Sequence, residues 1–217
     1  MTTSTRADWL LPLGLVVLAV VPLLAGGVRL AELAGGAAVT ARNARFFASP
    51  APAVLHILAV SVYGLLGAFQ FAPGFRRRHG RWHRIAGRVL VPCGLSAGLT
   101  GLWMTQYYPN ANNDADVVYA LRLLFGSAMV ASIIMGVLAV RRRDFAAHGA
   151  WMIRAYAIGL GAGTQVLTHL PWFVLVGTPG VTSRAALMGA GWVINVIVAE
   201  WAIRRWLVRP TPGLTPA

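Results

Sequence analysis

Histidines are the residues of this chain whose type and spacing could support redox chemistry. Four of the five lie near the ends of long apolar segments, and they sort by depth into two pairs, His56 with His169 and His83 with His148. Histidine is a usual axial ligand of haem iron, and ionisable residues at membrane depth are rare and mark functional sites. One pair near each membrane face therefore suggests b-type haem and an electron path across a bilayer.

Other polar side chains at the same two depths could complete these sites. Arginines could pair with haem propionates, and a run of small residues, Gly159, Gly161 and Gly163, could make room for a flat ring. The candidate cofactor-binding residues near the outer face are His56, His169, Gln165, Arg45 and Arg122. The candidates near the inner face are His83, His148, Arg88 and Arg154, with Arg84 close by.

Each pair also has a plainer interpretation. His56 and His169 could form hydrogen bonds between helices, for example with Gln165, as polar residues of membrane bundles do. His83 and His148 lie among interfacial arginines, where a histidine is often solvated or bound to lipid headgroups. A metal site at His56 and His169 is not expected, because zinc takes at least three protein ligands and no cysteine or carboxylate lies at that depth.

The composition identifies the elements that must position these residues. The chain is 57% hydrophobic and 12% charged, with a mean hydropathy of +0.65, whereas soluble domains carry about 25% charged residues. A bilayer span takes about 20 mostly apolar residues, and lipid admits only helices or closed barrels. Because no period-2 strand pattern is present, we predict an all-α polytopic membrane helix bundle. Six transmembrane helices are expected at about 9–28, 52–71, 85–106, 117–140, 150–176 and 185–207, as one bundle over 1–207, followed by a disordered tail over 208–217.

The charge distribution predicts the orientation of this bundle. The nineteen basic residues are all arginine and give a net charge of +13. They gather in the loops after the second and fourth segments and at the C-terminus, so the positive-inside rule places both termini in the cytoplasm. Arginines in such loops are topology signals, and no nucleic-acid partner is expected. The expected location is the inner membrane of a bacterium, with the lipid bilayer, and a quinone or membrane protein, as partners.

Residues 29–51 do not follow this rule, because their arginines would face outward. If this polar connection folds back over the bundle, Arg42 and Arg45 could cap a pocket that contains His56, and the segment would act as a lid. The glycine pair at 35–36 is expected to break the chain there. The apolar segment before it is long for a signal peptide and no clean cleavage site follows, so an uncleaved first helix is expected.

Helical periodicity places polar residues on common faces. One face of the second segment carries, at intervals of seven, His56, Tyr63 and Gln70. A single continuous helix from His148 through the 150–176 segment would likewise put His148 and His169 on one stripe, about 30 Å apart at 1.5 Å per residue. These stripes could line a polar path as well as hold a cofactor.

Two further features concern helix contacts. Glu200, in the sixth segment, could pair with Arg154 or Arg88, either as an ion pair that holds helix ends together or as a carboxylate that carries a proton. Gly94 and Gly98 form a G-x-x-x-G pattern, which favours close approach of two helices.

Four blocks of the sequence carry a family resemblance. They are His56 with Gly67 and Gln70–Phe71; His83–Arg88; Arg143–Asp144 with His148 and Trp151–Tyr156; and Ala199–Trp201. In these blocks the chain resembles bacterial predicted membrane proteins grouped as a domain of unknown function. The resemblance covers about residues 45–207 and is similar to an actinobacterial branch in Arg122–Ser127 and Gly161–His169, although an arginine frequent near Gln165–Leu167 is absent. It implies a membrane location and a helix count, and no established activity comes with it.

The sequence thus predicts an integral membrane protein and leaves three hypotheses for its function. The first is a b-type haem electron-transfer subunit with His56 and His169 near the outer face. The second is a carrier for a small solute or a proton that uses the polar stripes as its path. The third is a non-catalytic membrane subunit whose motifs hold the bundle and dock partners. Whether the chain is an enzyme is left open.

Overall fold

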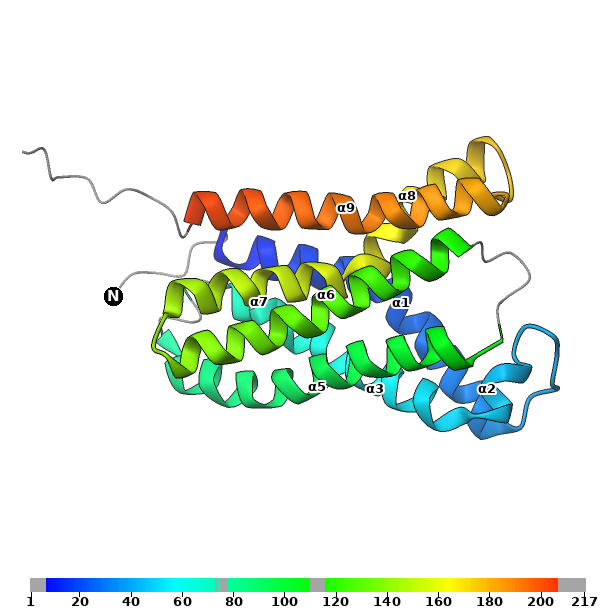
Figure 1. Cartoon of the computed structure of the whole chain (residues 1–217), viewed down its shortest axis with the longest axis horizontal. Coiled ribbons are helices and arrows are strands. Elements are labelled where there is room, and N and C mark those ends of the chain that lie inside the picture. The colour runs from blue at the N-terminus through cyan, green and yellow to red at the C-terminus, as the bar shows by residue number, and fades with distance from the viewer. Residues whose placement is uncertain (1–6, 73, 75–77, 110–115, 207–217) are drawn as a thin grey trace, which may run out of the picture.

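The computed structural model describes residues 7–72, 74, 78–109 and 116–206. Its helices follow one another along the chain as labelled in Figure 1. They are α1 (Ala7–Gly35), α2 (Ala44–Ala48), α3 (Pro50–Ala68), the 3-10 helix η1 (Phe69–Phe71), α5 (Gly80–Tyr107), α6 (Asp116–Arg141), α7 (Phe145–Gly159), α8 (Gly161–Leu175) and α9 (Val181–Trp206). The tail predicted over 208–217 lies outside the described residues.

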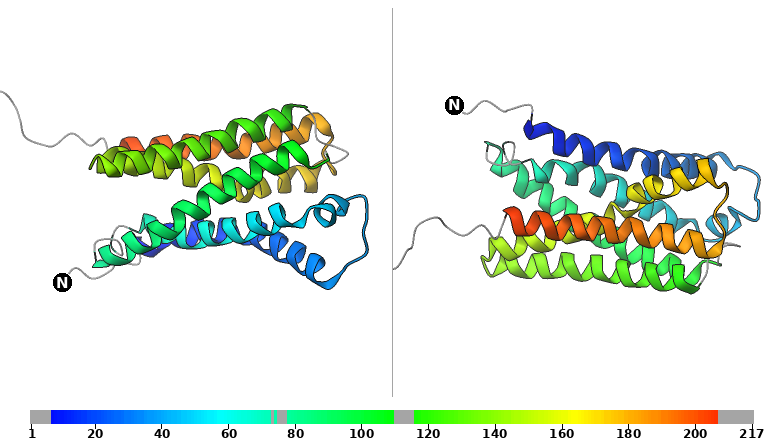
Figure 2. Two further views of the ribbon diagram at one scale, coloured as in Figure 1. Left: turned by 60° about the horizontal axis from the view of Figure 1, so that its bottom comes forward. Right: turned by 90° about the horizontal axis from the view of Figure 1, so that it is seen from above.

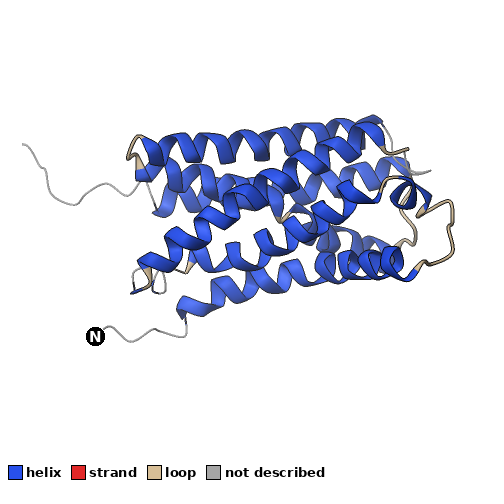
Figure 3. Ribbon diagram, turned by 90° about the horizontal axis from the view of Figure 1, so that it is seen from below, coloured by secondary structure: helices blue, strands red, loops and turns tan. Residues whose placement is uncertain are grey.

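The helices form two groups that α5 connects. In the left view of Figure 2, α1 and α3 lie on one side, α6 to α9 lie on the other, and α5 crosses obliquely between them. The contacts agree, since α5 packs on both α3 and α6 while α8 packs on α1 and α9. Regular structure in the described part of the chain is helical throughout (Figure 3), which confirms the predicted all-α membrane bundle.

Five of the helices are long and apolar enough to cross a membrane: α1, α3 with η1, α5, α6 and α9. The segment predicted as one span over 150–176 is instead two helices of 15 residues each, α7 and α8, separated at Leu160. Each is about 22 Å long at 1.5 Å per residue, short of a hydrocarbon core of about 30 Å, although together they run the length of the bundle (Figure 1). The six-span topology with cytoplasmic termini stays a prediction.

The break at Leu160 corrects the expected continuous stripe from His148 to His169. Glycine is a poor helix former, and three glycines, Gly159, Gly161 and Gly163, surround the break. The Asn195 side chain of α9 forms hydrogen bonds on both sides of this break. The Asn195 amide donates from Nδ2 to the Ala157 carbonyl oxygen at 2.9 Å and accepts at Oδ1 from the Thr164 hydroxyl at 2.7 Å.

The helix α1 extends about two turns beyond residue 28, where the first span is predicted to end. It stops where Gly36 adopts a left-handed φ of 62°. The Ala37 amide then donates to the Glu32 carbonyl oxygen at 3.1 Å, which is the Schellman arrangement that ends many helices at glycine. The connection expected over 29–51 is therefore largely helical, since it contains the end of α1, all of α2 and the start of α3.

Close packing between the helices depends on small residues. A Cβ added to Gly94 would lie 2.6 Å from the Tyr63 ring, and one added to Gly98 would lie 2.6 Å from the Val130 side chain. Real Cβ atoms do not approach other atoms so closely. The close helix contact predicted from the Gly94–Gly98 pattern is thus confirmed, with α3 and α6 as the partners of α5.

Candidate functional site

A large cavity lies inside the bundle, between α1, α3, α5, α6 and α8. Its volume is about 570 Å³, which is within the range of about 300–1,000 Å³ of small-molecule sites, and its walls are mostly apolar, as is usual for such sites. Four of the five residues predicted for the outer site line it: His56, Arg45, Arg122 and Gln165. Tyr63, which lies two helical turns after His56 on the same face of α3, lines the cavity as well. Gln70 lies beyond the cavity, in η1.

The His56 ring has a defined orientation and tautomer. Its Nδ1 lies 3.0 Å from the Ala97 carbonyl oxygen and 3.1 Å from the Thr100 hydroxyl. A carbonyl can only accept, and the Thr100 hydroxyl donates to the Ser96 carbonyl oxygen at 2.5 Å, so Nδ1 carries the proton in the neutral ring. Within the part of the chain that the structure describes, the hydrogen bonds of this ring involve Nδ1 alone. The Nε2 lone pair is therefore left for whatever occupies the cavity.

The segment that contains α2 forms one end of this cavity, because Arg45 and Phe46 line it. The Arg45 guanidinium lies over the Phe46 ring at 4.9 Å and donates to the Pro109 carbonyl oxygen at 3.2 Å. Tyr108 contacts Phe46 edge-on, with ring centroids 5.5 Å apart, and donates to the Ser49 carbonyl oxygen at 2.6 Å. Burial raises the pKa of the Tyr108 hydroxyl, which keeps it protonated as this donor. The segment thus covers the His56 cavity with Arg45.

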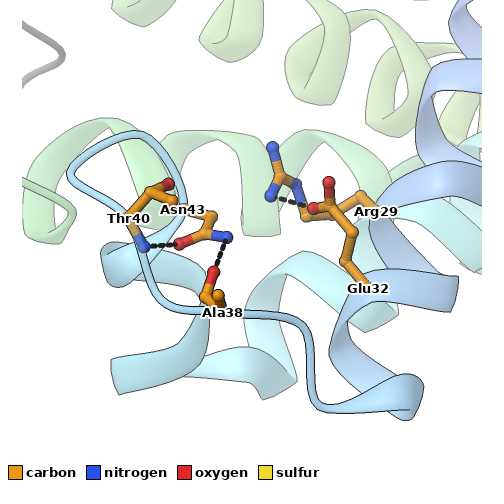
Figure 4. Close-up of polar contacts among 5 residues, drawn as sticks. All are labelled: Arg29, Glu32, Ala38, Thr40 and Asn43. Carbon is orange, nitrogen blue, oxygen red and sulfur yellow. Dashed lines mark hydrogen bonds and ion pairs between the residues drawn. The ribbon is translucent and has the colours of Figure 1, made fainter.

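A compact turn holds α2 in this position (Figure 4). Asn43, which is buried, accepts from the Thr40 amide at 2.6 Å and donates to the Ala38 carbonyl oxygen at 3.1 Å. Beside it, on the last turns of α1, Arg29 is paired with Glu32. The Arg29 guanidinium also lies 4.4 Å from the centroid of the Phe46 ring.

His169 lies apart from His56, in a second and more open groove between α8 and α9. Its Nδ1 lies 2.7 Å from the Gln165 carbonyl oxygen, one helical turn earlier. The Gln165 side chain lines both the cavity and the groove and donates to the Met188 carbonyl oxygen at 3.2 Å. The two histidines predicted as a ligand pair therefore line different spaces, with Gln165 in the wall between them.

The residues predicted for the inner site do not line either of these spaces. The His148 ring lies at 2.9 Å, through Nδ1, from the Gly136 carbonyl oxygen, which ties α7 to α6. Of the two partners considered for Glu200, it is Arg154 that binds it, through contacts of 2.5 and 3.0 Å. Arg88 is exposed on α5. His83 lies in the first turn of α5.

Of the three glycines expected to admit a flat ring, Gly159 and Gly163 line the cavity and Gly161 does not, and all three also pack closely against neighbouring helices. A Cβ on Gly161 would overlap the Trp192 indole, and one on Gly163 would overlap the Leu18 backbone. Sequence reasoning also missed Ala97, Thr100 and Phe46 as parts of the site. Two of these act through backbone or ring contacts that no residue spacing reveals, and only the lid interpretation of 29–51 pointed toward α2.

Comparison with known proteins adds a family to this geometry. Residues 53–203, more than two thirds of the chain, match the model of a family described as "Predicted membrane protein (DUF2306)". The chain belongs to this family. His56, Gln165 and His169 lie within the matched residues of this DUF2306 protein, while Arg45 and α2 precede them. No curated protein and no solved structure matches the chain significantly.

Proposed function

We propose that this membrane protein binds a b-type haem in the large cavity, with His56 as an axial ligand, and that it is an electron-transfer subunit of a bacterial cytoplasmic membrane. The observation that carries the proposal is the His56 ring itself. Histidines that ligate a metal almost always donate their other ring nitrogen to a carbonyl or carboxylate, which fixes the tautomer and raises the basicity of the ligating nitrogen. His56 does so through Nδ1 to Ala97, and its Nε2 is left for the cavity.

The remaining residues that line the cavity suit the porphyrin ring and the propionate groups of a haem. The mostly apolar walls would exclude water from the ring, and Arg45 and Arg122 supply guanidinium groups that match carboxylates. A bound haem would supply a one-electron redox couple within the membrane. The proposal uses His56 alone, because His169 lines the other groove. A quinone or a membrane protein would exchange the electron.

The first test is the visible spectrum of the protein purified in detergent from haem-replete cells. We expect dithionite-reduced minus oxidised difference bands and, by pyridine haemochrome, about one haem per chain. The bands should be lost in His56→Gly and partly restored by added imidazole, which replaces the ligand without the side chain. His148→Ala, which removes a histidine bonded to α6, is the matched control and should keep its haem. A colourless wild-type protein would contradict the proposal.

A second candidate function, a carrier for a small solute or a proton, is favoured by the break between α7 and α8. Transporters commonly place their substrate at discontinuous helices near the middle of the membrane. Here Leu160, at the break, and Gly163 both line the cavity. This candidate predicts pH-dependent flux in proteoliposomes that His56→Gln abolishes, and no chromophore. If neither flux nor colour is found, the third hypothesis, a non-catalytic membrane subunit, would be the one to pursue.

A further inference from the structure

The groove between α8 and α9 is distinct from the His56 cavity in shape and chemistry. It has a volume of about 470 Å³ and is wide open at the protein surface. Its apolar wall includes Val166, Leu170 and Phe173, of which Leu170 and Phe173 are 56% and 60% exposed. In a membrane such side chains contact acyl chains. The groove is thus open to lipid along its length.

Two polar side chains face this groove with complementary chemistry. The Arg184 guanidinium lines the groove and, besides its contact within the protein, is a permanent cation with five N–H donors. The His169 ring lies against the Gln165 carbonyl oxygen through Nδ1, so its neutral form carries the proton there and presents Nε2 as an acceptor. The groove therefore offers a cation and, separately, an acceptor for a hydroxyl.

The order of these residues along the helices matches the order of groups in a phospholipid. Arg184 is in the first turn of α9, at the α2 end of the bundle, and His169 is in the second half of α8. Val166 and Ala162 lie further from that end along α8. A lipid bound here would place its headgroup at the end of the bundle and its acyl chain along the deeper apolar wall.

We propose that the α8–α9 groove binds one anionic glycerophospholipid with a hydroxylated headgroup, the chemistry of phosphatidylglycerol. The phosphate accepts hydrogen bonds from Arg184, and a headgroup hydroxyl donates to Nε2 of His169. The acyl chain lies along Val166 and Ala162. The site does not depend on haem or on transport, because His169 and Arg184 line the groove and not the His56 cavity.

Native mass spectrometry of the delipidated full chain in detergent tests this site. We expect a single-lipid adduct with phosphatidylglycerol at about five- to tenfold lower concentration than with phosphatidylcholine, as the attraction of one arginine to a headgroup of net negative charge implies, because choline offsets the phosphate in phosphatidylcholine. Arg184→Gln should reduce this preference to what the hydroxyl contact with His169 contributes, and Arg184→Lys should keep most of it. The control is Arg141→Gln, which changes an exposed arginine at the C-terminal end of α6, and it should leave the lipid preference unchanged.

Phosphatidic acid separates the two headgroup contacts, because its phosphate lacks the glycerol hydroxyls. We expect wild-type protein to prefer phosphatidylglycerol over phosphatidic acid and His169→Phe to lose that preference while it still binds both. Equal adducts with phosphatidylglycerol and phosphatidylcholine in the wild type would overturn the proposal. So would an Arg184→Gln variant that folds, as judged by its elution volume, and keeps the preference undiminished.

Discussion

A Gly163→Ala substitution is expected to destabilise the bundle by about 2–3 kcal/mol, as overpacking of a tightly packed contact does. A Cβ at this position would overlap the Leu18 carbonyl oxygen and lie 2.9 Å from its carbonyl carbon. Because the obstructing atoms belong to the backbone, no rotamer change can relieve the clash. The contact between α1 and α8 must open instead, and both helices line the His56 cavity.

Thermal unfolding in detergent, followed by size-exclusion chromatography of the heated samples, measures this effect. Gly14→Ala on α1 is the matched control, because no atom lies within 4 Å of a Cβ there. Alanine is the better helix former by about 1 kcal/mol, so this control should match or exceed the wild type. Equal midpoints for the two variants would show that α1 and α8 do not approach each other as closely as the structure has them.

Replacing Asn195 by leucine should have the second-largest effect, a loss of about 1–3 kcal/mol of stability. The estimate follows from the two hydrogen bonds that are lost in a membrane interior, each worth about 0.6–1.7 kcal/mol. Nδ2 of Asn195 serves the Ala157 carbonyl oxygen beside the helix break, and Oδ1 holds the Thr164 hydroxyl. Both partners would remain without these bonds, because leucine can neither donate nor accept.

A double-mutant cycle with Thr164→Val separates the two bonds. Thr164→Val alone removes only the bond to Oδ1, so its cost should be about half that of Asn195→Leu, and the two costs should not add. Hydrogen–deuterium exchange should rise around residues 157–164 in Asn195→Leu and much less in Thr164→Val. Additive costs, or unchanged exchange at the break, would mean that Asn195 does not stabilise it.

The architecture was largely accessible from the sequence, because lipid leaves few alternatives. Long apolar segments separated by arginine-rich or turn-rich loops can only be membrane helices, and α3, α5, α6 and α9 lie where hydropathy predicts them. Family membership was accessible as well, because the motif blocks are short and lie at recognisable spacing. The end of α1 was missed because polar residues such as Arg29 and Glu32 can pair along a helix as readily as they occupy a loop.

The site was accessible only in part. The depth of a residue follows from its position along a helix, so the sequence grouped His56, Arg45, Arg122 and Gln165 as outer-face candidates, and the structure places all four on the lining of one cavity. The sequence does not predict which residues of two helices face each other, because this depends on how each helix is rotated about its axis and on which helix it packs against. His169 has a suitable depth and faces α9 instead.

What the sequence determined by itself was the class of protein and the small-residue faces that allow close packing. The tertiary structure alone decided that the helix carrying His148 and His169 breaks at Leu160, that Asn195 bonds beside the break, and that Ala97 sets the tautomer of His56. The last two of these share one physical reason. Each depends on one backbone carbonyl meeting one side chain from another helix, and backbone carbonyls are identical in every residue of the sequence.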